Sequence, residues 1–244
     1  MRTKKRRSFR HCQLCGRRLW RGGWIYAPNG MPDGQSIVVC DRCQETAPRC
    51  AVCGMPMEAK HVRLPDGRRI CTHCHTTAVY DPARGQVLFE HVTHIVAHQL
   101  GLALNVGTEF TLADDQHLRR LVTQASIAPQ ADPEKVVGLF VRKGRRRVMY
   151  VLSGLPQILL IQTVAHEWAH AWQGENCPLL QNPLVREGFA EWVAYKTLQA
   201  MGATKKAARM KQQDGMYGQG LRQMLELEQR GGVSGVLTFC RRAE

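Results

Sequence analysis

Four closely spaced cysteine pairs limit what the first third of this 244-residue chain can fold into. Eight of the ten cysteines fall into C-x-x-C pairs, namely Cys12 with Cys15, Cys40 with Cys43, Cys50 with Cys53, and Cys71 with Cys74. A C-x-x-C turn directs two thiolates toward one ion, and two such turns complete a closed tetrahedral zinc site. In chain order, the first two pairs predict one structural zinc site and the last two pairs predict another.

Disulfides and redox-active pairs are the alternatives to zinc. The basic start of the chain is followed by cysteines instead of an apolar secretion signal, which favours zinc over disulfides. His73 and His75 flank Cys74 and could replace it as a ligand, although four cysteines give both modules one pattern. Cys177 and Cys240 remain as free thiols without an inferred role. Few apolar residues lie between the pairs, so zinc binding should supply much of the folding free energy of this region.

The formal net charge of +14 is concentrated in three segments, Arg2–Arg10, Arg142–Arg147 and Lys205–Lys211. Such patches attract acidic protein surfaces or nonspecific nucleic acid, and most often they are simply a solvated face. No helix-turn-helix or aromatic-rich signature accompanies the charge. The chain contains no run of about 18 apolar residues, so we expect no membrane span and a cytoplasmic location.

The sequence predicts an α+β chain with a basic tail over 1–10, a double zinc-binding domain over 11–78 and a mainly helical domain with a small sheet over 79–244. The segments Pro28-Asn29-Gly30, Pro32-Asp33-Gly34 and Pro65-Asp66-Gly67 predict hairpin turns within the zinc-binding domain. Hydrophobic periodicity predicts helices over 87–104, 156–173, 184–201, 204–213 and 217–230, and strands over 136–141 and 147–152 that form a hairpin. Three histidines share a face of the first helix, but no acid or cysteine accompanies them, so His91, His94 and His98 are not assigned to a site.

Residues 166–170 are His-Glu-Trp-Ala-His within a strongly apolar segment. Four residues make just over one helical turn, so His166 and His170 face the same way and can offer two imidazoles to one ion, with Glu167 beside them. In this H-E-x-x-H arrangement the glutamate acts as the base that activates a metal-bound water. A match of five residues alone arises by chance in a few per cent of chains, so the assignment needs corroboration.

Corroboration comes from a second predicted helix, which carries Glu187 and Glu191 one turn apart. One of them can be a third metal ligand, which leaves a position open for water as a catalytic zinc site requires. The other can hydrogen-bond a ligating histidine and fix its tautomer. The alternative is that both glutamates are solvated helix charges.

These features resemble the gluzincin class of zinc peptidases, in which H-E-x-x-H is followed after a loop by a glutamate on a second helix. Glu187-Gly188-Phe189-Ala190 is similar to the E-G-x-A form of that helix in zinc aminopeptidases. The resemblance implies that Glu187 binds the metal and that Glu191 supports a ligand. It also implies that Tyr217, in a Tyr-x-x-Gly element, donates to the oxyanion, with Tyr195 as the alternative donor.

A closer resemblance covers most of the chain. Gly154-Leu155-Pro156, the residues around His166–His170 and Glu187-Gly188, placed behind cysteine modules, are similar to the plant LIM-domain peptidases that limit organ growth and to their bacterial relatives. That family implies a zincin-like domain, one catalytic and two structural zinc ions, and protein or peptide substrates. The zinc half departs from it, because Cys40 stands where a LIM domain usually has histidine and six residues separate Cys43 from Cys50. Ubiquitin regulation and the family's partners are therefore not carried over.

The resulting hypothesis is a zinc peptidase whose zinc modules recruit a partner or substrate, and whose strand 148–152 could pair with an extended peptide. The alternative is an interaction or nucleic-acid-binding regulatory protein with an inactive peptidase-like domain.

Overall fold

The computed structural model describes residues 2–5, 10–20, 22–26, 36–58, 61–124, 136–144 and 146–243. The chain divides into two compact units, Met1–Ala78 and Val79–Glu244. The turns predicted at 28–30 and 32–34 lie outside the described residues, as does Arg145 of the predicted hairpin turn. None of the helices in the described ranges combines the length and apolar character that a membrane crossing requires.

The first unit is built from short elements around its cysteines. They are β1 (Arg2–Lys5), β2 (Gly23–Tyr26), β3 (Ile37–Val39), α1 (Asp41–Thr46), β4 (Val62–Arg63), β5 (Arg69–Ile70) and α2 (Thr72–Thr76). Strands β1, β2 and β3 form an antiparallel sheet, so Arg2–Lys5 of the basic tail are part of a sheet. The hairpin predicted at Pro65-Asp66-Gly67 is confirmed, because β4 pairs antiparallel with β5 and Gly67 takes the positive φ of 87° that this turn needs.

Two small cores lie in the first unit, and cysteines make up a large part of each. One contains Cys12 and Cys40 with Tyr26, Val39 and Met55. The other is formed by Cys50, Met57, Leu64, Ile70, Cys71 and Cys74. Clusters this small bury little apolar surface, which agrees with a unit that depends on bound metal for its stability.

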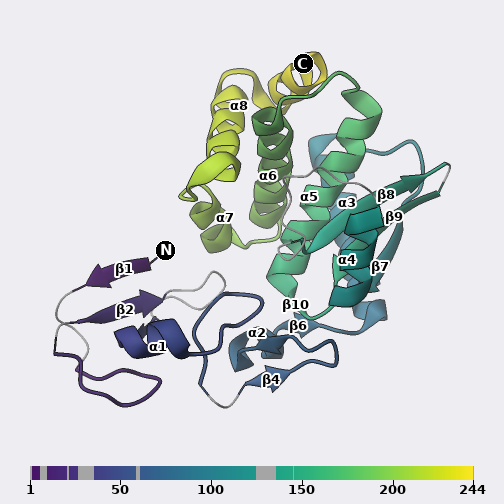
Figure 1. The fold of residues 1–244 in the computed structure, drawn as a ribbon. Helices are drawn as coiled ribbons and strands as arrows, with labels where there is room; N and C mark the ends of the chain where they lie inside the picture. Colours follow the sequence, from purple (N-terminus) through teal and green to yellow (C-terminus); the bar gives the residue numbers. More distant parts are fainter. Residues whose placement is uncertain are drawn as a thin grey trace. The chain divides into compact units, whose positions relative to one another are not determined.

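The second unit is mostly helical, with one three-stranded sheet (Figure 1). Its elements are α3 (Pro82–Leu100), β7 (Glu109–Ala113), α4 (Asp115–Gln124), β8 (Gly138–Lys143), β9 (Arg146–Leu152), β10 (Leu155–Pro156), α5 (Gln157–Asn176), α6 (Pro183–Ala200), α7 (Thr204–Met210) and α8 (Gly215–Arg242), and β10 pairs with β6 (Ala78–Val79). Helix α5 lies between the sheet and α6, and α8 packs on α6 (Figure 1).

Several predicted elements change in extent. The helix expected over 87–104 begins at Pro82, because the Asp81 carboxylate caps its first N–H groups, and it ends before Gly101, whose positive φ of 69° terminates it. The predicted helix 217–230 is part of the longer α8, which is interrupted at Gly232. Neither β7 nor α4 was predicted.

The sheet order also corrects one functional expectation. The strand predicted to accept a peptide, within β9, lies in the middle of the sheet, because it pairs in parallel with β7 and antiparallel with β8. Its backbone groups are therefore already in use on both sides. Among the described strands β8 has a single neighbour, so β8 is an edge.

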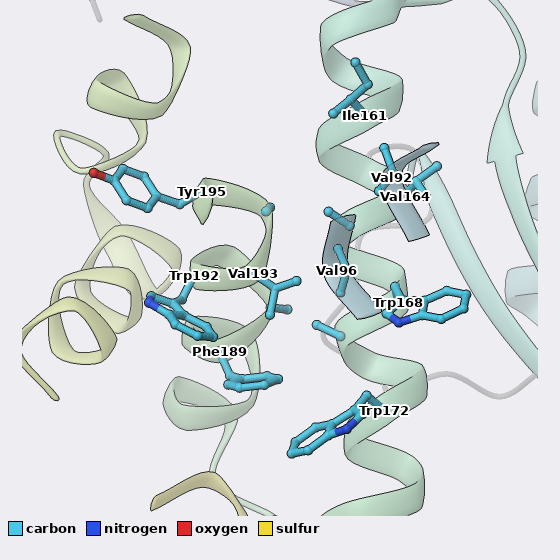
Figure 2. Close-up of a cluster of buried hydrophobic side chains, with 14 of the residues drawn as sticks. Val92, Val96, Ile161, Val164, Trp168, Trp172, Phe189, Trp192, Val193 and Tyr195 are labelled. Atoms are coloured by element: carbon cyan, nitrogen blue, oxygen red, sulfur yellow. The ribbon is translucent and has the colours of Figure 1, made fainter. Parts of the chain in front are cut away.

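Aromatic side chains fill the contact between α5 and α6 (Figure 2). Trp172 of α5 stacks on Phe189 of α6 at 5.4 Å between ring centroids, and Phe189 lies 5.7 Å from Trp192. All three are essentially inaccessible to solvent. This apolar contact fixes α5 and α6 side by side, so that polar residues elsewhere on the same two helices face each other at defined distances.

A buried ion pair joins the sheet to α5. Arg147 of β9 pairs with Glu175 near the end of α5, and the two side chains are only 8% and 7% exposed. Glu175 also accepts hydrogen bonds from the backbone and side chain of Asn105. The neighbouring pair of Arg146 with Glu109 is 69% and 56% exposed and provides a surface counterpart.

Candidate metal centre

The structure brings the eight paired cysteines together in two groups. One group is Cys12, Cys15, Cys40 and Cys43, and the other is Cys50, Cys53, Cys71 and Cys74. Four sulfurs about 2.3 Å from a tetrahedral zinc ion lie about 3.8 Å apart. The Sγ atoms of Cys15 and Cys40 are 3.7 Å apart, and those of Cys53 and Cys71 are 3.8 Å apart. Both groups therefore fit zinc.

The surroundings favour the thiolate at some of these cysteines, whereas the pKa values of Cys43, Cys53 and Cys74 are raised by burial and by the neighbouring cysteines. Burial raises the pKa of the Cys12 thiol, but hydrogen bonds from the backbone N–H groups of Cys40, Cys15 and Leu14 outweigh it and lower the pKa to about 6. In the second group, hydrogen bonds from the other three cysteines hold the pKa of Cys50 well below its usual value. A thiolate is the form that binds zinc.

A third group of possible ligands lies in the second unit, where His166 and His170 of α5 face Glu187 of α6. The Nε2 atoms of the two histidines are 3.1 Å apart, and each lies 3.4 Å from Glu187 Oε2. Nitrogen and oxygen donors about 2.0–2.1 Å from a tetrahedral zinc ion lie about 3.3–3.4 Å apart. The three atoms thus match one face of a zinc coordination tetrahedron, with the fourth corner not supplied by this set.

Hydrogen bonds fix the orientation of both imidazoles. His166 Nδ1 lies 3.0 Å from Glu191 Oε1, one turn beyond Glu187 on α6. His170 Nδ1 lies 2.9 Å from Oε1 of Gln173, which is buried and donates its Nε2 to the Arg186 carbonyl. A donor hydrogen on each Nδ1 leaves each Nε2 as the atom that would offer its lone pair to a metal ion held together with Glu187.

The sequence analysis did not identify Gln173. Its position three residues after His170, on the same face of the helix, is the signal that could have found it.

In this cluster, the positive charge of a protonated histidine and the negative charges of the glutamates stabilise each other. Burial alone would lower the pKa of His166, but hydrogen bonds with Glu187 and Glu191 and the charge of Glu167 raise it to about 10. Burial would raise the pKa of Glu187, but its bonds to His166 and His170 hold it far below the usual range. In the metal-free centre His166 therefore holds an extra proton, because the carboxylates around it favour a positive charge. A divalent metal ion can take the place of that proton.

Glu167 lies where α5 meets the beginning of the edge strand. A Cβ atom added to Gly138, the first residue of β8, would lie 2.4 Å from Thr163 Cγ2, 3.0 Å from Glu167 Cγ and 3.1 Å from its Oε1. Only glycine fits this contact without displacement. Glu167 extends from α5, the helix that also carries the two histidines, and its half-buried side chain packs against the backbone of β8.

Two glycines let α8 approach α6 closely enough to bring in a tyrosine. A Cβ on Gly188 would lie 2.6 Å from Gly220 Cα, and a Cβ on Gly220 would lie 2.5 Å from Gly188 Cα, so the backbones are in direct contact. Tyr217 precedes Gly220 by one turn, and its ring centroid is 6.3 Å from that of His166. Burial and the charges of Glu187, Glu191 and Glu167 raise its pKa, which keeps the hydroxyl protonated as a donor.

Tyr195, the alternative donor, does not join the cluster. It is buried on α6, Lys211 lies 5.9 Å from its ring centroid, and its hydroxyl points away from α5 (Figure 2). The rings of His94 and His98 on α3 are 4.3 Å apart, but neither belongs to a group of three or more possible ligands among the described residues.

Comparison with known proteins links the chain weakly to LIM domain-containing plant proteins. Protein DA1-related 1 of Arabidopsis thaliana is 25% identical over 189 residues, which cover 64% of this chain and 34% of that protein. Protein DA1 of the same plant is 25% identical over 187 residues, covering 64% and 35%. LIM domain-containing protein HDR3 of Oryza sativa subsp. japonica is 24% identical over 188 residues, covering 64% and 37%.

The chain thus spans about a third of the length of the curated relatives it matches. No family model and no solved structure matches it.

Proposed function

We propose that this chain is a zinc-dependent peptidase with a zincin-like second unit and two structural zinc modules. The observation that carries the proposal is the triangle of His166 Nε2, His170 Nε2 and Glu187 Oε2, whose sides are 3.1, 3.4 and 3.4 Å. Three protein ligands with one open corner are typical of catalytic zinc, whereas structural zinc has four. The similarity to DA1-related proteins is consistent with this assignment.

A zinc ion held by these residues would polarise the scissile carbonyl and lower the pKa of a bound water toward neutrality. Glu167 would serve as the base that takes a proton from the attacking water and returns it to the leaving amine. Its position supports this role, because it lies beside the two histidines on α5 and against the strand along which a substrate backbone could lie. Glu191 and Gln173 hold the imidazoles in place during the reaction.

Tyr217 is the proposed donor to the oxyanion that forms on the substrate carbonyl. It stays protonated, it lies next to His166, and it is 47% exposed, so its hydroxyl can reach a substrate. A correctly placed donor of this kind contributes about 100-fold to 1,000-fold in rate.

The free edge of β8 is the proposed binding position for an extended peptide, in place of β9. An extended segment that hydrogen-bonds to β8 would pass Gly138, which packs against Glu167. This placement would align a peptide bond with the reacting groups without requiring a particular side chain. Protein or peptide substrates are therefore proposed, with the zinc modules recruiting the substrate or a partner.

The decisive experiment compares cleavage of a denatured protein mixture by the native chain and by Glu167→Gln. The variant keeps the size of the side chain and all proposed zinc ligands, so it should hold the same zinc and lose about 100-fold to 10,000-fold in rate. Tyr217→Phe should lose about 100-fold, whereas the matched control Tyr195→Phe should keep its rate. Equal cleavage by the native chain and Glu167→Gln, or no cleavage by either, would favour a binding protein with an inactive peptidase-like unit.

A further inference from the structure

Arg186 lies directly beside the proposed metal ligand Glu187, near the beginning of α6. Its Nε and Nη2 atoms each donate to Glu187 Oε1 at 3.2 Å, whereas the other carboxylate oxygen, Oε2, faces the two histidines. The guanidinium therefore holds one oxygen of Glu187 and leaves the other for a metal ion. The backbone of Arg186 is fixed as well, because its carbonyl accepts a hydrogen bond from Gln173 Nε2 at 3.1 Å.

Part of the Arg186 guanidinium is available to a ligand. The Arg186 side chain is 50% exposed, although that of Glu187 is only 11% exposed. An arginine has five N–H donors, and the bonds to Glu187 use one on Nε and one on Nη2. Within the part of the chain that the structure describes, Nη1 and the second Nη2 hydrogen have no acceptor. These two nitrogens form an edge whose parallel N–H groups match the two oxygens of a carboxylate.

This guanidinium lies close to the groups that would react with a substrate. It is bonded to a carboxylate whose other oxygen is 3.4 Å from the Nε2 atom of each histidine. Burial and the charges of the three nearby glutamates raise the pKa of Tyr217, and the charge of Arg186 acts against them. Tyr217 is itself 47% exposed. A substrate that contacts the metal centre and Tyr217 would therefore have Arg186 beside it.

The charges around the centre determine which substrates this arginine can favour. Three carboxylates, those of Glu167, Glu187 and Glu191, act on the same place and would repel a fourth in the absence of a cation. A metal ion that binds Glu187 through Oε2 makes Oε1 a weaker acceptor, which leaves more of the Arg186 charge for a second carboxylate. The net charge of +14 draws acidic peptides toward the whole chain. Local and long-range charge thus both favour an acidic substrate.

We propose that Arg186 binds a carboxylate of the substrate close to the bond to be cleaved, so that the peptidase prefers acidic peptides. The inference rests on the proposed function and names its substrate class. The carboxylate can belong to an aspartate or glutamate side chain or to the C-terminus of a peptide, because both offer the same pair of oxygens.

The test measures peptide binding by the zinc-loaded Glu167→Gln chain, which keeps all proposed zinc ligands and cleaves slowly. Fluorescence anisotropy compares labelled peptides of one length. One set is amidated at the C-terminus and carries a glutamate at each position in turn, a second set has glutamine instead, and a third peptide is neutral with a free C-terminus. A charged hydrogen-bonded pair should strengthen binding about 10-fold to 100-fold over the matching neutral amide. A gain in the first set would assign the carboxylate to a side chain, and a gain in the third peptide would assign it to a chain end.

Variants of Arg186 in this Glu167→Gln chain show whether the arginine makes the contact. Arg186→Gln should reduce the affinity ratio to about 1, and Arg186→Lys should keep only part of it, because an ammonium group cannot pair with both oxygens in one plane. Arg119→Gln is the matched control, since Arg119 is 40% exposed, donates its Nε to Asp115 Oδ2 at 2.7 Å and carries the same charge. The ratio should be unchanged in this control, and zinc content is measured for every variant.

A ratio that survives in Arg186→Gln would overturn the inference, because the metal ion or the general positive charge would then hold the carboxylate. Equal binding of the glutamate and glutamine peptides, or no binding of either, would also overturn it and leave Arg186 with the orientation of Glu187 alone. The native chain separates this inference from the proposed function. Cleavage of both peptide sets at equal rates would keep the peptidase and refute the preference, whereas selective binding without any cleavage would refute the peptidase and keep the carboxylate site.

Discussion

Replacing Gly188 by alanine places a methyl group between the touching backbones of α6 and α8. The added carbon would lie 2.6 Å from Gly220 Cα, 2.7 Å from its carbonyl carbon and 2.8 Å from its oxygen. Ordinary contacts to carbon begin near 3.5 Å, so the helices must separate by about 1 Å. A flexible side chain could relieve the contact by changing its rotamer, but a backbone cannot. The loss of folding stability should therefore reach the upper part of the usual range for overpacking, about 3 kcal/mol.

The loss should be visible in both stability and catalysis. For a unit of this size, about 3 kcal/mol lowers the Tm by roughly 6–12 °C. Moving α8 also moves Tyr217 relative to His166, and a displacement of about 1 Å from the reacting atoms can cost about 100-fold in rate. Zinc content should stay the same, because the three proposed ligands lie on α5 and α6.

Gly174→Ala is the matched control. Gly174 also lies within a helix, its added Cβ would meet nothing within 4 Å, and alanine favours helix over glycine by about 1 kcal/mol. Calorimetry and a peptide-cleavage assay should therefore show an unchanged or slightly raised Tm and full activity for this variant. If Gly188→Ala melts within 1 °C of the native chain and cleaves at the same rate, the backbone contact does not position Tyr217.

Three further predictions concern charge and metal. Arg147→Met should cost about 3–5 kcal/mol in urea unfolding, because it leaves the charge of the buried Glu175 uncompensated, whereas Arg146→Met at the exposed pair should change the stability far less. In the metal-free chain, the raised pKa of His166 gives stability that is complete below its unfolded pKa of about 6.5 and is lost as pH rises toward 10. Zinc binding there should release about one proton at pH 7, measured by calorimetry in buffers of different ionisation enthalpy, and affinity should rise with pH; no proton release would contradict this. Emission spectrometry should find three zinc ions per chain, and chelation should unfold Met1–Ala78 first; a value of two zinc ions would contradict the catalytic site.

The cysteine spacing was sufficient to predict which sulfurs would meet. With only two residues between them, the two thiols of a pair are held close enough to bind the same ion. The first pair in the sequence combines with the second, and the third combines with the fourth. The helical spacing of His166 and His170 was equally informative, because one turn of helix fixes their separation whatever surrounds it. Local geometry determines both features, so a single sequence contains them.

Other parts of the fold depend on contacts that a local pattern does not encode. The parallel pairing of β7 with β9 joins segments more than 35 residues apart, and it converts the strand expected at an edge into the central one. Similarly, the sequence does not indicate that Gly188 and Gly220 allow a close helix contact, because that contact forms only where α6 packs on α8. Gln173 looked like an ordinary helix residue until its partners on both sides were known.

The two imidazoles of the metal centre have unequal companions, since Glu191 is an anion and Gln173 is neutral. An anionic companion makes an imidazole the stronger electron donor. Glu187 and Glu191 contact the imidazoles and the charge of Glu167 acts on them too, so acids already surround the place of a divalent cation, and the neutral amide adds no further charge. A glutamate in place of Gln173 would add one more negative charge and make the ion a weaker Lewis acid, which gives the amide a role beyond holding a ring in place.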